Sequence, residues 1–303
     1  MTDDASPWTL YWSNNTPQSC IASQKGSDAE AVETIWREFV AELKHDAKIL
    51  DLATGNGAVP GAMLRDRQSY SITAVDRADI APLKYLEDPG HLQQVKFIGG
   101  IDVGKLPMAD QSFDALSSQF GIEYGDLAAI ATEVSRVLKP GGRCLFLIHH
   151  QHSAIVSPNA LLIEELENAL QGGGLVETLQ AFLKGSCSAP QVEQKGQQYL
   201  NSPGRKTRQI SGQLFEGIGI ILKSADSNSD RASAIAENMV TRLKAEYARL
   251  KQMQAASLSR EEILDFKAQL VNTGLRVNEP EAMTVGVGED EALIGWLLSG
   301  IKA

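Results

Sequence analysis

KILDLATGNG, at residues 48–57, is the stretch of sequence that decides the fold of this chain. Its first half is a short apolar run typical of a buried strand, and its second half is a glycine-rich turn. Gly55 and Gly57 lack a Cβ atom, so the backbone there can adopt positive φ and a ligand can approach the main chain. We therefore expect a strand, a tight turn and a helix at 58–67 that together hold a nucleotide-like ligand.

A second predicted strand, at 71–76, ends in a carboxylate. Asp76 follows the glycine turn by about 20 residues, which is the distance at which a ribose-binding acid is expected. A carboxylate can accept hydrogen bonds from both ribose hydroxyl groups. We therefore expect Asp76 to bind a ribose, and the alternative is a solvated acid in a turn.

The residue at position 60 indicates which kind of nucleotide the turn could bind. A dinucleotide-binding turn carries a third glycine or alanine three residues after Gly57, whereas this chain has Pro60. Proline is tolerated in the first turn of a helix, so the helix can still begin near Ala58. The turn therefore favours a ligand that has adenosine and ribose but no pyrophosphate.

Strand and helix patterns alternate over the first half of the chain, which is typical of a doubly wound α/β fold. The predicted strands lie at 48–53, 71–76, 94–98, 113–119 and 143–149, and the predicted helices at 58–67, 79–87 and 126–138. Ligands of such sheets bind at the carboxyl ends of the strands. Five residues would gather at that edge: Gly55, Asp76, Asp102, Gln119 and His149.

The alternation stops between His152 and Ser259. Helical patterns dominate there, and residues 191–209 form a polar stretch. Ser259 and Glu262 then predict a capped helix. Two last strands are predicted after it, at 275–285 and 291–301. We predict a Rossmann-like seven-stranded sheet, mostly parallel with an antiparallel C-terminal strand, and a helical insert between strand five and the following helix.

An aromatic cluster lies near the start of the chain. Trp8, Tyr11 and Trp12 recur with a period of three to four residues. Their rings could close over adenine or a cation, and packing against the sheet edge is an equal alternative. The cluster lies in the N-terminal part of the chain.

The pattern of predicted strands and helices divides the chain into three parts. They are an N-terminal aromatic segment and helix at 1–47, a ligand-binding core at 48–152 and 259–303, and the helical insert at 153–258.

The order of several motifs resembles that of the class I S-adenosylmethionine-dependent methyltransferases. DLATGNG at 51–57 resembles their first motif, and Ala53 departs from it because many members carry glycine there. Later motifs resemble their third-strand acidic loop, their fourth strand and their turn into strand five: FIGGIDV at 97–103, LP at 106–107, SFD at 112–114 and RVLKPGGR at 136–143. Over about 100 residues, this joint order is more specific than any one motif.

The resemblance implies S-adenosyl-L-methionine as the cofactor and gives roles to the strand ends. Asp102 would receive the amino group of adenine while the Val103 N–H faces the ring; the alternative for Asp102 is a helix cap or a loop acid. Asp51 would help to hold the cofactor's amino group indirectly or would only bond loop amides, and Phe120 could be ordinary core. The implied cofactor-binding residues are Asp51, Ala53, Gly55, Gly57, Asp76, Arg77, Asp102, Val103, Gln119 and Phe120. Additions after strand five often form a lid over the substrate in this family, so we place the insert above the ligand.

Three of the five histidines lie within four residues at the predicted end of strand five. Alternation along a strand places His150 and His152 on one side and His149 on the other. A histidine with a pKa near neutrality could take a proton from a hydroxyl or amine of the acceptor. We therefore predict His150 and His152 as catalytic bases and Glu123 as a further candidate; the alternative is substrate hydrogen bonding or a surface strand end. No metal site is expected, because nothing local supplies a further ligand.

Composition limits the partners of the chain. The 303 residues carry a formal net charge of −10, which makes a nucleic-acid substrate unfavourable. Lys195 to Arg208 could hold an anionic group, although a solvated loop is favoured. The three cysteines are unpatterned, so neither a disulfide framework nor a zinc site is indicated. The acidic amino terminus and the lack of a long apolar run predict a cytoplasmic protein that does not span a membrane.

The predicted function is S-adenosyl-L-methionine-dependent methyl transfer to a small-molecule acceptor. Two alternatives stay open: a non-catalytic regulatory module that binds S-adenosyl-L-methionine, and a methyltransferase with a protein or RNA acceptor. A nicotinamide dehydrogenase on a similar sheet is disfavoured by Pro60 and by the acidic loop at Asp102. The sequence leaves the acceptor atom and the oligomeric state open.

Overall fold

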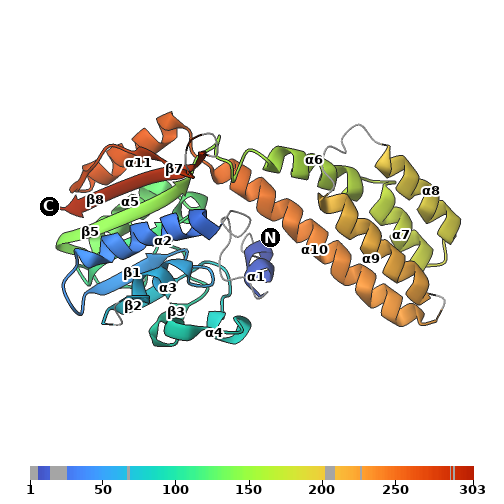
Figure 1. The fold of residues 1–303 in the computed structure, drawn as a ribbon, viewed down its shortest axis with the longest axis horizontal. Coiled ribbons are helices and arrows are strands. Elements are labelled where there is room, and N and C mark those ends of the chain that lie inside the picture. The colour runs from blue at the N-terminus through green and yellow to red at the C-terminus, as the bar shows by residue number, and fades with distance from the viewer. Residues whose placement is uncertain are drawn as a thin grey trace. The chain divides into compact units, whose positions relative to one another are not determined.

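The structure is a computed structural model, which describes residues 6–13, 26–66, 69–201, 209–225, 227–286, 288 and 291–303. These residues form two compact units (Figure 1). The first unit comprises the described residues up to Ser157 and those from Ala255 onward, and the second comprises Pro158–Gln254. Among all the residues that the structure describes, no helix combines the length and the apolar character that crossing a membrane requires.

The first unit is built on a mixed sheet. Its described strands are β1 (Lys48–Leu52), β2 (Ser71–Val75), β3 (Lys96–Ile98), β4 (Phe113–Gln119), β5 (Leu138–His149), β6 (Leu275–Val277), β7 (Glu281–Val285) and β8 (Ala292–Lys302). Their order across the sheet is β3-β2-β1-β4-β5-β8-β6, and β7 also pairs with β8. β1 to β5 run parallel, whereas β8 is antiparallel to β5, β6 and β7. This topology confirms the predicted Rossmann-like fold with an antiparallel C-terminal strand.

The single strand predicted at 275–285 is wrong, because two strands occupy that stretch. β6 pairs with the last residues of β8, and β7 pairs with the first half of β8. Between them lies Pro280, which has no backbone N–H to donate to a ladder and which restricts the residue before it. The ladder therefore breaks at Pro280, and the described sheet has eight strands where seven were predicted.

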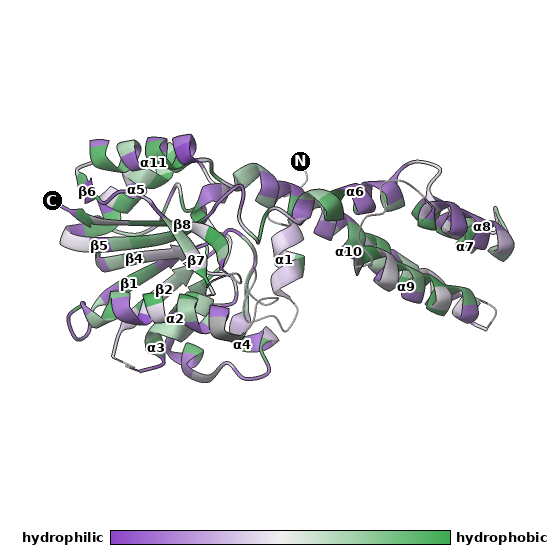
Figure 2. Cartoon of the chain, turned by 45° about the horizontal axis from the view of Figure 1, so that its top comes forward, coloured by the Kyte–Doolittle hydropathy of each residue, from purple (hydrophilic) through white to green (hydrophobic). Residues whose placement is uncertain are grey.

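Helices cover both faces of this sheet. The described helices of the first unit are α1 (Ser6–Trp12), α2 (Gly26–Ala41), α3 (Ala58–Leu64), α4 (Pro82–Tyr85), α5 (Leu127–Val137) and α11 (Arg260–Asn272), with short 3₁₀ turns η1 (Gly90–Gln94) and η2 (Ile122–Tyr124). Figure 2 shows α5 and α11 on one face and α2 and α3 on the other. The main apolar core includes the fully buried Leu50, Ile130 and Phe146. Burial of β1 on both faces explains why its sequence is a nearly continuous apolar run.

Two predictions about helix limits had different outcomes. The capping box of α11 is confirmed, since Ser259 N donates to Glu262 Oε2 (2.8 Å) and Glu262 N donates to Ser259 Oγ (3.3 Å). The helix predicted at 79–87 is shorter, because α4 begins with Pro82 and ends before Leu86, whose backbone is extended. A proline in the first turn fixes where a helix can start.

The chain leaves and re-enters the sheet at neighbouring positions, on either side of the helical insert. Leu258 N donates to the His149 carbonyl (2.8 Å), and Gln151 N donates to the Leu258 carbonyl (3.2 Å). Trp296 Nε1 on β8 donates to the same Leu258 carbonyl (3.0 Å). Both ends of the insert are therefore fastened at the carboxyl end of β5.

The second unit consists of helices that share an apolar core. They are α6 (Asn159–Leu170), α7 (Leu175–Leu183), α8 (Ala189–Leu200), α9 (Gln209–Ala225) and α10 (Ser229–Ala256). Leu179, Ile221 and Ala232 are fully buried in that core. The buried Glu165 carboxylate accepts the Ser211 N–H (2.9 Å) in the first turn of α9. A negative charge at a helix N-terminus is stabilising, so Glu165 holds the start of α9 in place.

The solvated loop predicted at 195–208 is wrong for its first residues, because α8 extends through Leu200. Val192 and Tyr199 are buried on α8, which gives the helix an apolar face despite its polar composition. Lys195 therefore lies on a helix. The rest of the basic stretch, at 202–208, lies outside the described residues. The lid role of the insert stays a prediction.

Candidate active site

The turn after β1 holds its backbone in the left-handed region three times. Positive φ angles occur at Ala53 (53°), Gly55 (54°) and Gly57 (86°). Gly57 is also the N-cap of α3 and supplies no side-chain cap to the N–H groups at the start of that helix. Alanine adopts a left-handed conformation at a cost of about 1–2 kcal/mol. Ala53 is therefore a strained residue at a site where the chain needs an unusual backbone path.

The structure brings Asp76 directly against this turn. Asp76 Oδ2 accepts the Gly55 N–H (2.8 Å), and Oδ1 accepts the Ala78 N–H (2.8 Å). The carboxyl group is buried, and burial raises its pKa to about 6 although both hydrogen bonds act in the opposite direction. Asp76 thus joins the end of β2 to the turn after β1. Its neighbour Arg77 is exposed.

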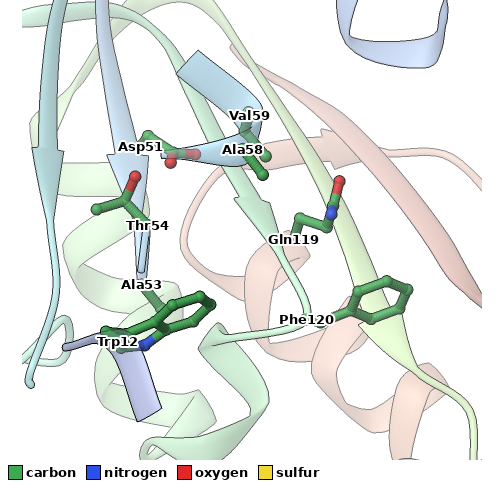
Figure 3. Close-up of a pocket in the computed structure, with 8 residues that line it drawn as sticks. All are labelled: Trp12, Asp51, Ala53, Thr54, Ala58, Val59, Gln119 and Phe120. Carbon is green, nitrogen blue, oxygen red and sulfur yellow. The ribbon is translucent and has the colours of Figure 1, made fainter. Parts of the chain in front are cut away.

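Asp51 lines a pocket beside the turn (Figure 3). Ser117 Oγ on β4 donates to Asp51 Oδ1 (2.6 Å), whereas no hydrogen bond of normal geometry reaches Asp51 Oδ2 among the described residues; the neighbouring Thr54 hydroxyl only opposes the rise in the Asp51 pKa. The side chain is fully buried, and burial raises its pKa to about 7. A buried acceptor without a partner at a pocket wall is suited to a ligand or a water molecule. The lining residues are Trp12, Asp51, Ala53, Thr54, Ala58, Val59, Gln119 and Phe120.

Asp51→Asn is expected to stabilise the ligand-free protein at alkaline pH. The Asp51 pKa is about 7 in the folded protein against an ordinary value of 3.8. Burying the ionised carboxylate therefore costs stability above pH 7, and the cost fades as the pH falls toward 4. The neutral amide avoids this cost, so the free energy of unfolding should rise by about 1–3 kcal/mol near pH 8.

Thermal unfolding of the wild type and of Asp51→Asn measures this effect. The difference between them must shrink as the pH is lowered from about 8 to about 5. Asp79→Asn, which neutralises an exposed carboxyl near the same turn, is the matched control and should leave stability unchanged. A less stable Asp51→Asn at alkaline pH would contradict the argument.

The chain that leaves β4 forms the wall of the pocket opposite the turn. Trp36 Nε1 on α2 donates to Gln119 Oε1 (2.6 Å), which fixes the Gln119 amide and leaves its NH₂ group to donate elsewhere. Phe120 follows with a φ of 55°. A Cβ atom on the next residue, Gly121, would collide with the Cβ of Ala53. Glycine is therefore required at position 121 for the turns after β1 and β4 to meet.

The acidic loop after β3 lies beside the predicted ribose acid. Ile101 N donates to the Asp76 carbonyl (2.8 Å). Asp102 is exposed, and its Oδ1 accepts the Gly104 N–H (2.8 Å) within a local turn, while Val103 is buried. The structure thus brings this loop next to Asp76, and its contact with adenine stays a prediction.

The three histidines at the end of β5 have separate surroundings. β5 ends at His149, so a turn and not strand alternation brings the rings of His150 and His152 within 5.8 Å. His150 Nδ1 accepts the His152 backbone N–H (2.9 Å), and the His150 ring lies 4.5 Å from that of Trp296. His152 is exposed. No group of three or more His, Cys, Asp or Glu side chains suited to a metal ion occurs in the part of the chain that the structure describes.

Glu123 and His149 form a buried pair that the sequence reasoning missed. Glu123 Oε1 accepts the backbone N–H of His149 (2.9 Å) and contacts its Nδ1 (2.6 Å), and both side chains are fully buried. The hydrogen bonds to both the backbone and the ring of His149 fix the Glu123 side chain against the end of β5. The rings of Phe120 and Tyr124 flank the His149 ring at 4.6 Å and 5.9 Å. The pair therefore supports the wall that Phe120 presents to the pocket.

Known proteins are similar to this chain over the strands and turns that carry the site. Residues 50–146 match a family model described as a methyltransferase domain. A demethylmenaquinone methyltransferase of Thermotoga maritima is 37% identical over 121 residues, which cover 38% of this chain and 51% of that protein. A ubiquinone/menaquinone biosynthesis C-methyltransferase of Desulfotalea psychrophila is 37% identical over 122 residues, which cover 37% of this chain and 46% of that protein. The chain spans about half the length of these curated relatives.

A solved structure is similar along the whole chain. It is a candidate S-adenosyl-L-methionine-dependent methyltransferase of Methanococcus maripaludis, 16% identical, and the similarity covers 100% of this chain and 94% of that one with a TM-score of 0.45. Residues 50–146, which match the family model, include every predicted cofactor-binding residue. The prediction of an S-adenosyl-L-methionine-dependent methyltransferase domain is confirmed over residues 50–146.

Proposed function

We propose that this protein is an enzyme that transfers the methyl group of S-adenosyl-L-methionine to a small-molecule acceptor. The buried Asp76 carboxylate, bonded to the Gly55 N–H at the end of β2, is the observation that carries the proposal. A carboxylate has about four acceptor positions, and the backbone N–H groups of Gly55, Ala78 and Arg77 use three of them, so one remains for a ribose hydroxyl.

The polar groups around the pocket fit the rest of this cofactor. Asp51 Oδ2 needs a hydrogen-bond donor, which the ammonium group of the cofactor would supply. Gln119 lines the same pocket, and its amide NH₂ group suits a carboxylate. Asp102 and Val103 would hold the adenine ring. When bound, the sulfonium of the cofactor supplies an electrophilic methyl carbon, and the chain aligns the acceptor and excludes water.

The hydrogen bonds at the end of β5 indicate different roles for the histidines that were predicted as bases. Because His150 Nδ1 accepts the His152 N–H, the neutral His150 ring carries its hydrogen on Nε2 and presents a donor to the acceptor. Burial, together with the nearby His152, lowers the pKa of His150 and keeps that ring neutral. We therefore assign proton acceptance to His152 and orientation of the acceptor to His150. Glu123, engaged with His149, shapes the wall instead of touching the acceptor.

A small acceptor is better supported than a macromolecule. The curated relatives carry names that place them in quinone biosynthesis, and the net charge of −10 disfavours RNA. An aromatic ring of the quinol type is thus the first acceptor class to test. A regulatory module that binds the cofactor without turnover would share the glycine turn and Asp76, so turnover has to be measured directly.

Titration calorimetry with S-adenosylhomocysteine and, separately, with NAD tests the cofactor. We expect S-adenosylhomocysteine to bind and NAD not to bind. S-adenosyl-L-methionine with a deuterated methyl group is then incubated with naphthoquinols, with bulk tRNA and with a protein extract, and mass spectrometry locates the label. Label on the quinols supports the proposal. Binding of NAD alone, or label on RNA or protein, would contradict it.

A further inference from the structure

The helix α1 lies at the edge of the sheet where the parallel strands end (Figure 1). It carries the aromatic cluster of Trp8, Tyr11 and Trp12, and no family motif accounts for it. The Trp12 ring lies directly on the glycine turn: a Cβ atom at Gly55 would stand 2.6 Å from Cε2 of that ring. The absence of a side chain at Gly55 therefore makes room for an indole of the same chain as well as for a ligand.

Three loops of the active site hold α1. Asn56 Nδ2, in the turn after β1, donates to the Trp12 carbonyl (3.0 Å), and Asp79 N, after β2, donates to Thr9 Oγ1 (3.0 Å). The Trp8 ring meets the Tyr124 ring after β4 edge to face at 5.2 Å. A helix of seven residues is not stable by itself. The position of α1 thus depends on contacts with the loops that bind the cofactor.

The indole of Trp12 is part of the pocket wall. It lines the same pocket as Asp51, Ala53 and Gln119 (Figure 3). Trp12 is largely buried and also packs with Ala78 and Ile80. An indole beside a bound sulfonium would be attracted to its positive charge. A cofactor in this pocket would therefore lie between the strand ends and α1.

We propose that Trp12 is a cofactor-binding residue and that α1 is a strap which closes the cofactor site and lifts to let the cofactor exchange. The proposal rests on the proposed function, because it takes the pocket of Asp51 and Gln119 as the cofactor site. The short length of α1 and its attachment through side chains of the loops, with no strand pairing, allow it to lift without disturbing the sheet.

Stopped-flow measurement of S-adenosylhomocysteine exchange in the full chain tests the strap. Trp12→Ala should release the ligand about tenfold faster, since the lost aromatic contact is worth roughly that factor, and should bind it more weakly. Thr9→Val, which removes only the bond from Asp79 N, should also speed both association and dissociation. Tyr70→Ala, which truncates a buried ring just before β2 at the opposite end of that strand, is the control and should leave both rates unchanged.

The outcomes separate this inference from the proposed function. If the wild type fails to bind S-adenosylhomocysteine, the proposed function fails first. If the wild type binds it but Trp12→Ala exchanges it at the wild-type rates, α1 is no strap. Tighter binding by Trp12→Ala would mean that the indole occupies the ligand's place, which also overturns the proposal. Should Trp12→Ala not fold, Trp12→Phe decides, with an intermediate dissociation rate expected.

Discussion

Asp76→Asn should weaken the binding of S-adenosylhomocysteine by about tenfold to a hundredfold at pH 8, because a charged hydrogen-bond acceptor is worth about 1.5–3 kcal/mol. The carboxylate serves the Gly55 N–H and the Ala78 N–H at the same time. An asparagine has one acceptor oxygen, so its NH₂ group must face one of these N–H groups. The substitution therefore loses the ribose contact and loosens the turn together.

The pH dependence of binding gives the same assignment a second test. Asp76 has a pKa of about 6 in the folded protein, raised by burial. Ribose hydroxyl groups donate to the ionised form, so affinity should be full above pH 6 and should fall as the pH drops through that value. The side chain of Asp76→Asn does not titrate, so the remaining affinity of this variant should not fall as the pH drops through about 6 in the way that the wild-type affinity does.

Titration calorimetry between about pH 5 and pH 8 measures both effects. Asp79→Asn neutralises an exposed carboxyl three residues along the chain and should keep the wild-type affinity and pH profile. If Asp76→Asn binds S-adenosylhomocysteine as tightly as the wild type, Asp76 does not bind the ribose.

His149→Ala should lower the free energy of unfolding by about 3–5 kcal/mol, since truncating one member of a buried hydrogen-bonded pair leaves its partner unsatisfied and opens a void. Glu123 would keep only the bond from the backbone N–H at position 149, and its second oxygen already lacks a partner among the described residues. Phe120 and Tyr124 would lose the ring between them.

Urea unfolding followed by tryptophan fluorescence is the suitable measurement. All four tryptophans of the chain belong to the first unit, so the signal reports that unit even if the second unfolds separately. His152→Ala, an exposed histidine three residues away, is the matched control and should change stability by less than about 0.5 kcal/mol. Equal effects of the two substitutions would show that the Glu123–His149 pair stabilises nothing.

The cofactor side of the site follows from local sequence. Residues 48–57 encode a strand and a turn in succession, and Asp76 falls beside that turn because a right-handed crossover returns the chain to the neighbouring position in the sheet. The capping box at Ser259 is equally local. Such features depend on spacing and residue type, which the sequence displays directly.

The acceptor side could not be predicted in this way. Glu123 and His149 belong to different elements and meet only because β4 and β5 pair in parallel. The position of α1 depends on contacts with three loops, and no period in its own sequence encodes them. The break in the predicted strand at 275–285 did have a visible signal, since Pro280 cannot lie in the interior of a ladder.

The hydrogen bonds of Leu258 to the backbone of His149 and Gln151 have a consequence for how such a chain can diversify. They form a closed stem, so the intervening residues 152–257 impose no change of register on β5 or β8. Insertions at a stem of this kind cost little conformational entropy per added residue. The helical segment can thus be lengthened, shortened or replaced without changing the strands and turns of the cofactor site.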